Sequence, residues 1–379
     1  ASTAAFADSG ELFYQQVQLS GRIPMVAAMM GPGAAGTAYI PALADFVPMV
    51  KGTSFMALGG PPLVKAVVGE EVTEEELGGS EVHTKYSGVA DLEVVSDEAC
   101  LQVIRDYLSF FPSNCYEMPP QRDFGEAPEG AEEALLAALP DNPRMAYDMK
   151  LILRSVVDDG NLFEIKPEFA RNIITSLARI GGRPVGILAN QPSVLAGALD
   201  IDASDKAARF MNLCDAFGIP LVFFQDVPGF LVGTQAERSG IIRHGAKMLF
   251  AVSEATVPKI TVVVGKAYGA GYYVMCGKAY GPDLIVAWPN AEISLMGAAG
   301  AVNIIFRQQI AAAEDTAAER ARLEKEFSEK IGAYPAAEAG LIDDIIDPRE
   351  TRATILRGLE LAENKEIPEP GKKRSVRPV

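Results

Sequence analysis

The sequence predicts an α/β protein made of two related domains. Residues 23–60 and 257–297 share one order of elements: an apolar strand, a turn rich in Gly and Ala, a helix, and a second apolar strand ending near Met and Gly. Elsewhere strands alternate with helices, which is typical of layered α/β folds. A chain of 379 residues with 49% hydrophobic residues can also build two cores.

The repeated pattern divides the chain into domains. We assign residues 1–120 to an N-terminal domain, which contains the first copy of the pattern and then a strand and an amphipathic helix within 88–114. Residues 121–147 are rich in Pro, Gly and acidic side chains, a composition that predicts a surface linker with one short helix. Residues 148–379 form the C-terminal domain.

The C-terminal domain continues the alternation. We expect strands over 183–190 and 219–226 and helices near 204–217 and 240–255, followed by the second copy of the pattern. Residues 308–330 predict a charged helix with i,i+4 pairs, which fits a solvated or subunit-bridging face better than a binding site.

Composition excludes several classes of function. A formal net charge of −16 disfavours nucleic acid and anionic membrane surfaces as partners, and no segment reads as a signal peptide or a membrane span. The four cysteines lack metal-binding spacing, which indicates reduced thiols in a cytoplasm-like compartment. The chain has only two histidines, His83 and His244, which leaves few candidate residues for a catalytic triad or a histidine-rich metal site. No metal is therefore expected. A structural role is the favoured reading of each histidine.

The small-residue turns are the candidate catalytic sites. A strand that runs through such a turn into a helix leaves the first helical N–H groups without intrahelical partners. At Ala35-Gly36 and at Ala270-Gly271, a carbonyl oxygen can approach these amides and be stabilised as an oxyanion. One such turn is explained as well by close packing of helix on strand, but the matched pair favours two carbonyl-binding sites.

Long segments also carry a resemblance to a known family. Residues 161–271, 75–91, 296–306 and 340–352 are similar to the carboxyltransferase (β) subunit of biotin-dependent acyl-CoA carboxylases, the family of propionyl-CoA and methylcrotonyl-CoA carboxylase. The match runs over nearly the whole chain in the order of the family's motifs. The family's N-terminal domain begins well before the position of Ala1, so we expect the front part of that domain to be absent here.

The resemblance implies a fold and a mechanism. Each domain is expected to be a crotonase-like ββα superhelix. Ala35 and Gly36 would hold the thioester carbonyl of an acyl-CoA, and Ala270 and Gly271 would hold the ureido oxygen of biotin. Carboxybiotin would release CO2, the biotin enolate would take the α-proton, and the acyl enolate would attack CO2. No protein base is then required, which suits a chain so poor in histidine.

Two further segments have competing interpretations. The resemblance places Asp226, Pro228, Gly229 and Phe230 near the biotin pocket, while a sharp structural turn explains them equally well. A second small-residue helix start either lines the acyl pocket or permits close helix packing. It comprises Gly297, Ala298, Ala299 and Gly300.

Tyr273 is the candidate selector of the acyl group. Propionyl- and acetyl-type members of the family tend to hold a short residue such as Asp at this position, whereas the surrounding stretch is more similar to methylcrotonyl- or geranyl-type members. Residues 296–304 instead resemble the propionyl type. The tyrosine ring would limit the acyl chain, stack on a planar unsaturated acyl group, or simply pack under the helix.

The resemblance also implies partners. We expect a separate biotin carboxylase and biotin carboxyl carrier subunit, an acyl-CoA substrate, and a homohexamer of stacked dimers with each active site between domains of different subunits. The expected location is the cytoplasm, or the mitochondrial matrix in a eukaryote. The alternatives are the carboxyltransferase subunit of an acyl-CoA decarboxylase or transcarboxylase, and a non-catalytic scaffold paralogue.

Overall fold

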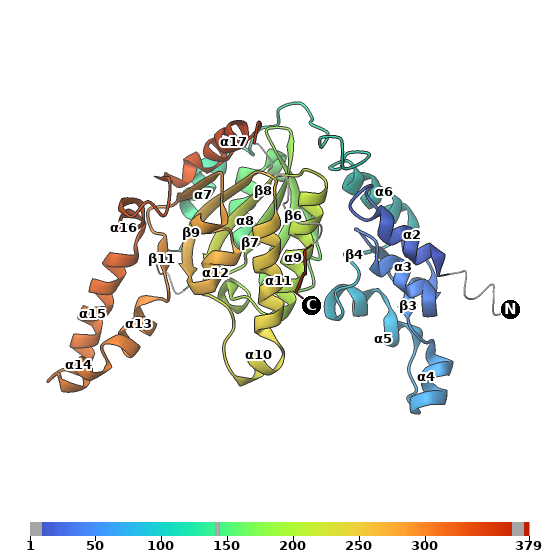
Figure 1. Cartoon of the computed structure of the whole chain (residues 1–379), viewed down its shortest axis with the longest axis horizontal. Coiled ribbons are helices and arrows are strands. Elements are labelled where there is room, and N and C mark those ends of the chain that lie inside the picture. The colour runs from blue at the N-terminus through green and yellow to red at the C-terminus, as the bar shows by residue number, and fades with distance from the viewer. Residues whose placement is uncertain (1–9, 141, 143–144, 366–374, 379) are drawn as a thin grey trace. The chain divides into compact units, whose positions relative to one another are not determined.

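The computed structural model describes residues 10–140, 142, 145–365 and 375–378. The chain divides into two compact units. Unit 1 consists of Ala1–Gln121, Phe163–Ala170 and Leu213–Ile219, and unit 2 of Arg122–Leu162, Arg171–Asn212 and Pro220–Val379. In Figure 1 the colours from blue to red follow the chain through these units.

Unit 1 is built from short elements. Its strands include two small parallel pairs, β1 with β3 and β2 with β4. The elements are α2 (Glu11–Leu19), β1 (Pro32–Ala34), the 3₁₀ helix η1 (Ala35–Ala38), α3 (Tyr39–Ala42), β2 (Pro48–Val50), β3 (Phe55–Ala57), α4 (Pro61–Val68), α5 (Glu74–Gly78), the π-helix η2 (Val82–Tyr86), β4 (Leu92–Val94), α6 (Asp97–Leu108) and β5 (Phe163–Ile165).

The core of unit 1 is apolar and partly aromatic. Phe46 and Tyr107 are fully buried and stack with ring centroids 4.3 Å apart. Phe163 packs beside both rings, at 5.7 Å from Phe46 and 6.1 Å from Tyr107. Segment Phe163–Ala170 therefore completes the core of unit 1 although it lies far away in the sequence.

Unit 2 is organised by a mixed sheet. Its strands run in the order β12-β10-β9-β8-β7-β6, and β11 pairs with the end of β9. The β6–β7 pair is antiparallel and the other described pairs are parallel. The strands are β6 (Ile173–Ile180), β7 (Arg183–Asn190), β8 (Leu221–Val227), β9 (Lys259–Tyr268), β10 (Leu284–Ala287), β11 (Glu292–Ser294) and β12 (Asp344–Ile345).

Helices cover both faces of this sheet. Successive residues of a strand point to opposite faces, so Val262 and Val264 of β9 join the core beneath α7, α8 and α17, whereas Val263 joins the core beneath α12 and α16. In Figure 1, α11 and α12 lie in front of the sheet. The helices are α7 (Ala131–Ala137), α8 (Met149–Val156), α9 (Ile201–Ala216), α10 (Thr234–Arg238), α11 (Ile241–Glu254), α12 (Gly269–Val274), α13 (Ala298–Ile305), α14 (Arg307–Ala312), α15 (Thr316–Ile331), α16 (Ala333–Glu338) and α17 (Thr351–Leu361), with 3₁₀ turns η3 (Asp158–Gly160), η4 (Leu195–Gly197), η5 (Lys278–Tyr280) and η6 (Pro348–Glu350).

Most of the predicted elements are confirmed, with three corrections. The strand predicted over 183–190 is β7, and the helices predicted near 204–217 and 240–255 are α9 and α11. The single helix predicted over 308–330 is wrong, because the chain breaks between α14 and α15, where Asp315 caps the second helix by accepting from the N–H groups of Ala317 and Ala318.

The second correction is a missed strand, β6. Its eight residues are all buried. It is difficult to recognise in the sequence because three of its buried residues, Thr175, Ser176 and Arg179, are polar and interrupt the apolar pattern. Burial lowers the pKa of Arg179 to about 10.

The third correction concerns the apolar strands of the repeated pattern. The strand expected from residue 23 is an irregular extended segment with single bridges at Val26 and Met29, and regular pairing begins only at Pro32. The second strand of each copy is two short strands, β2 and β3 in unit 1 and β10 and β11 in unit 2.

No helix among the described residues is long and apolar enough to cross a bilayer.

Candidate functional site

Strand pairing shows that the repeat predicted from the sequence is a structural repeat. In unit 1 the incoming segment pairs first with β2, at Met29 and Met49, and then with β3, at Ala34 and Ala57. In unit 2 the incoming strand β9 pairs first with β10 and then with β11, ending at Tyr268 and Ser294. All of these pairings are parallel. Each unit therefore delivers a strand into a turn and a helix in the same way.

The backbone of the two turns matches residue by residue. Ala34 and Tyr268, each extended, are the N-cap residues of η1 and α12. The next residues, Ala35 and Gly269, both have positive φ, at 58° and 55°. When the two turns are aligned on these residues, Ala35 corresponds to Gly269 and Gly36 corresponds to Ala270. The two Ala-Gly pairs are therefore offset from each other by one position. The first N–H groups of both helices point out of the helix without intrahelical acceptors.

The turn in unit 1 is open. Ala35 and Gly36 are exposed, and a Cβ added at Gly36 would meet only the Phe13 ring at 3.7 Å, an ordinary contact. The Thr37 hydroxyl donates to the Ala34 carbonyl oxygen at 2.7 Å, which fixes the turn. A carbonyl oxygen can reach the backbone amides here without displacing a side chain.

The turn in unit 2 is tighter. Ala270 is exposed, but Gly271 is buried, and a Cβ there would lie 2.8 Å from Val227 Cγ2 and 3.1 Å from Gly229 Cα. Gly269 is also confined, because its Cβ would approach the Leu295 carbonyl oxygen to 3.0 Å. The segment after β8, which includes Gly229, thus lies directly against the Ala270-Gly271 turn.

The four residues assigned to the biotin pocket in that segment differ in their surroundings. Asp226 is 5% exposed, and burial raises the pKa of its carboxyl. Pro228 is exposed, and Gly229 has a φ of 126° that requires glycine. Phe230 forms a parallel bridge with Leu199, and its ring lies against Gly245 of α11. Of these four residues, Gly229 borders the turn, and the neighbouring Val227 does so as well.

The second small-residue helix start is α13, as predicted. Gly297 is its N-cap, and Ala298, Ala299 and Gly300 form its first turn. A Cβ at Gly297 would lie 2.9 Å from the Tyr268 ring, so this glycine permits close packing. The Tyr268 hydroxyl donates to the Glu292 carboxylate, and burial raises the pKa of Tyr268. The end of β9 is therefore tied to β11 just before α13 begins.

The two tyrosines of α12 point in different directions. Tyr272 is buried, and its hydroxyl accepts from the Lys278 N–H at 2.9 Å. Tyr273 is 45% exposed, and its ring lies 5.9 Å from that of Tyr272 and 6.0 Å from that of Tyr280. Tyr272 is thus the ring that packs under the helix, and Tyr273 is presented at its surface.

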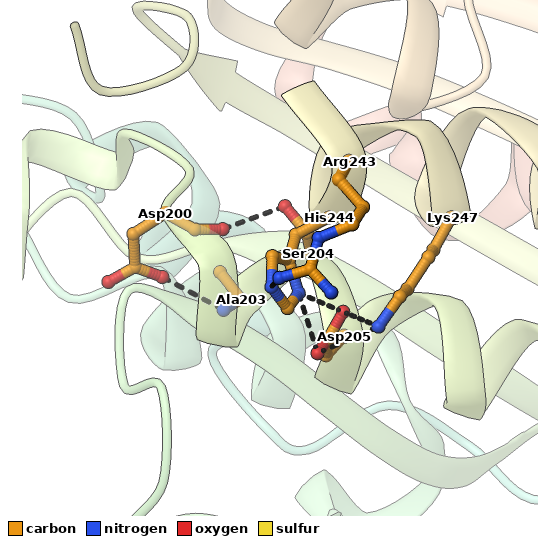
Figure 2. A network of polar contacts seen from close by, with 7 residues as sticks. All are labelled: Asp200, Ala203, Ser204, Asp205, Arg243, His244 and Lys247. Carbon is orange, nitrogen blue, oxygen red and sulfur yellow. Dashed lines mark hydrogen bonds and ion pairs between the residues drawn. The ribbon is translucent and has the colours of Figure 1, made fainter. Parts of the chain in front are cut away.

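Both histidines are held by polar contacts. His83 lies between the Ser87 hydroxyl at 2.7 Å and the Met56 carbonyl oxygen at 2.6 Å, both in unit 1. His244 on α11 contacts Asp205 and Arg243 (Figure 2); its Nδ1 lies 2.9 Å from the Asp205 carboxylate and its Nε2 lies 3.1 Å from the Arg243 guanidinium. Lys247 pairs with the same carboxylate at 3.1 Å. These contacts support the structural role predicted for each histidine.

The arrangement suits a class of enzyme that works through backbone dipoles. Each turn offers N–H groups of Ala and Gly at the start of a helix, the geometry that stabilises an enolate or another oxyanion. The same device occurs once in each unit, which suits a reaction with two carbonyl groups. Transfer of a carboxyl group between two such carbonyl compounds is a reaction of this kind.

The chain belongs to the carboxyl transferase domain family, which matches residues 2–376. It is 49% identical over 361 residues to the methylmalonyl-CoA decarboxylase subunit alpha of Veillonella parvula, a match that covers 95% of this chain and 70% of that protein. It is 47% identical over 371 residues to the propionyl-CoA carboxylase carboxyltransferase subunit of Haloferax mediterranei, covering 98% and 72%.

The solved structures agree. A transcarboxylase 12S hexamer crystallised with methylmalonyl-coenzyme A superposes with a TM-score of 0.94 at 45% identity, over 99% of this chain and 72% of that one. The geranyl-CoA carboxylase β subunit of P. aeruginosa gives a TM-score of 0.59 at 32% identity. The predicted family, its crotonase-like fold and its biotin-dependent carboxyltransferase activity are confirmed.

Proposed function

We propose that this chain transfers a carboxyl group between carboxybiotin and a short-chain acyl-CoA such as propionyl-CoA or methylmalonyl-CoA. The single observation that carries the proposal is the repeated strand, turn and helix with matching register in both units. The names of two of its relatives, propionyl-CoA carboxylase and methylmalonyl-CoA decarboxylase, support the acyl size.

The two turns take different carbonyls. The N–H groups at Ala35 and Gly36 hold the thioester carbonyl oxygen and stabilise the enolate as the α-proton leaves. The N–H groups at Ala270 and Gly271 hold the ureido oxygen, beside Pro228 and Gly229. Bound biotin supplies the transferable carboxyl group and the base. The open turn in unit 1 fits a large CoA thioester, and the walled turn in unit 2 fits a compact bicyclic ring.

An assay of the assembled complex tests this function. With a biotin carboxylase and a biotinylated carrier subunit, the chain should fix radioactive bicarbonate into propionyl-CoA faster than into acetyl-, butyryl- or methylcrotonyl-CoA. Complex formation without any transfer would identify a scaffold paralogue instead. We further propose a separate carrier subunit as the partner of this chain.

The decarboxylase direction is the second candidate function. It is favoured by the 49% identity to the methylmalonyl-CoA decarboxylase subunit. If it holds, methylmalonyl-CoA should lose its carboxyl group to the biotinylated carrier without ATP, and the complex should fix no bicarbonate at a comparable rate.

Substitution of Tyr273 should change the choice of acyl group. Because the ring is presented at the surface of α12, Tyr273→Ala should shift the ratio of kcat/KM among acyl-CoAs by about 10-fold, as expected for about 1–3 kcal/mol of lost fit. Tyr272→Phe is the matched control, since it alters the neighbouring buried ring. An unchanged substrate profile in Tyr273→Ala and in Tyr273→Asp would rule out this role.

We also propose that the chain is active only as an oligomer. The structure with a TM-score of 0.94 is described as a hexamer, which supports a hexamer of stacked dimers here. Light scattering combined with the transfer assay should find activity only in the oligomeric fraction. An active monomer would contradict an active site shared between copies.

A further inference from the structure

The strand β9 is distorted just before it enters the Ala270-Gly271 turn. In its pairing with β8, Gln225 lies opposite Val263, but Val227 lies opposite Ala267. Asp226 alone therefore faces the three residues 264–266, which makes a bulge in β9. A bulge bends its strand and redirects the residues that follow it. The direction in which β9 delivers the turn depends on this distortion.

The Asp226 side chain fills and holds the bulge. Its Oδ1 accepts from the Lys266 N–H at 2.9 Å, and its Oδ2 accepts from the Tyr147 hydroxyl at 2.9 Å. A Cβ at Gly265 would lie 2.7 Å from the Asp226 Cγ, so the glycine makes room for the carboxylate. The Asp226 N–H is itself held by Asn190 Oδ1 at 3.2 Å.

The preceding residue, Gln225, is bonded to the C-terminal end of α12, the helix that follows the Ala270-Gly271 turn. Neighbouring strand residues point to opposite faces, and Gln225 points to the face that carries α12. Its Nε2 donates to the Met275 carbonyl oxygen at 2.5 Å, at the C-cap of α12. Gln225 is fully buried, and among the described residues its Oε1 has no hydrogen-bond partner. A buried amide with one unpaired atom costs stability, so the donated bond to α12 is the interaction that it provides.

We propose that Asp226 and Gln225 are positioning residues that set the Ala270-Gly271 amides, Asp226 by fixing the bulge in β9 and Gln225 by anchoring the end of α12. This inference rests on the proposed function, because the amides matter only if they bind a carbonyl oxygen. It assigns Asp226 to the support of the turn from the opposite face of the sheet. A displacement of the amides by about 1 Å would lower the rate by about 10²-fold.

The test compares two Asp→Asn changes on one strand. Asp283 accepts from the Lys259 N–H at 2.8 Å at the start of β9 and pairs with Lys365, so Asp283→Asn weakens a comparable carboxylate tie to the backbone far from the turn. Carboxyl transfer from methylmalonyl-CoA to free d-biotin is measured for the full chain, together with hydrogen exchange of the peptide covering residues 264–272. Asp226→Asn should lower kcat by about 10- to 100-fold with little change in KM for methylmalonyl-CoA, and exchange should rise. Asp283→Asn should lower Tm while kcat stays within about twofold.

Two more variants separate positioning from folding. Gln225→Met keeps the volume, removes the unpaired oxygen and deletes the donor, so we expect a folded protein with reduced kcat. Tyr147→Phe should give a smaller loss than Asp226→Asn, since it removes only one of two bonds to the carboxylate. Unchanged exchange of residues 264–272 in Asp226→Asn would overturn the inference, even if the wild type proves inactive with biotin. Equal loss of kcat in Asp283→Asn would overturn it as well.

Discussion

Gly271→Ala is expected to abolish most of the carboxyl transfer to biotin. The new Cβ would lie 2.8 Å from Val227 Cγ2 and 3.1 Å from the Gly229 backbone, and Val227 is fully buried, so the turn itself must move. A shift of about 1 Å in the amides costs about 10²-fold in kcat. Gly271→Pro should be more severe, because proline also deletes the N–H that holds the oxyanion. Steady-state kinetics with free d-biotin and methylmalonyl-CoA measure both effects.

The matched control is a glycine of the same unit that has room for a side chain. A Cβ at Gly332 would come no closer than 4.0 Å to the nearest atom, the Ser328 carbonyl oxygen, so Gly332→Ala should retain its activity. The amide assignment fails if Gly271→Pro folds, assembles and still transfers carboxyl to biotin at a normal rate.

Truncation of Lys166 should destabilise unit 1 more than any surface change. Its ammonium lies 2.9 Å from the Asp91 carboxylate and donates to the Gly88 carbonyl oxygen at 2.7 Å, and the side chains are only 6% and 2% exposed. Lys166→Ala leaves a buried carboxylate without its cation, which costs about 3–5 kcal/mol. Urea unfolding monitored by far-UV circular dichroism should show this loss of stability as a lower unfolding midpoint.

An exposed ion pair in the same unit provides the comparison. Lys85 and Glu81 form an i,i+4 pair with side chains 43% and 52% exposed, so Lys85→Ala should leave the midpoint of urea unfolding almost unchanged. The double variant Lys166→Met/Asp91→Asn should recover part of the loss, because it removes both buried charges. Equal effects of Lys166→Ala and Lys85→Ala would contradict the assignment of a buried pair.

The sequence by itself identified the repeated pattern, the family and the two small-residue turns. Strong local signals made this possible: Ala35-Gly36 and Ala270-Gly271 each follow an apolar stretch and open a helix. Regular elements such as β7 and α11 were also predicted closely, because their hydrophobic patterns are uninterrupted. The strand β6 was missed, since its polar residues Thr175, Ser176 and Arg179 are buried only in the folded chain.

Tertiary structure alone decided how the turns are supported. The sequence marked Asp226 and Gly229 as one motif, but strand pairing placed the Asp226 carboxylate in a bulge and Gly229 against Gly271. It also showed that Tyr272 is buried while Tyr273 is exposed, which two identical neighbours in sequence cannot reveal. Strand register and close packing join residues 30 or more positions apart, as with Asp226 and Lys266, whose separation is 40 residues. Local sequence preferences carry no information about such contacts.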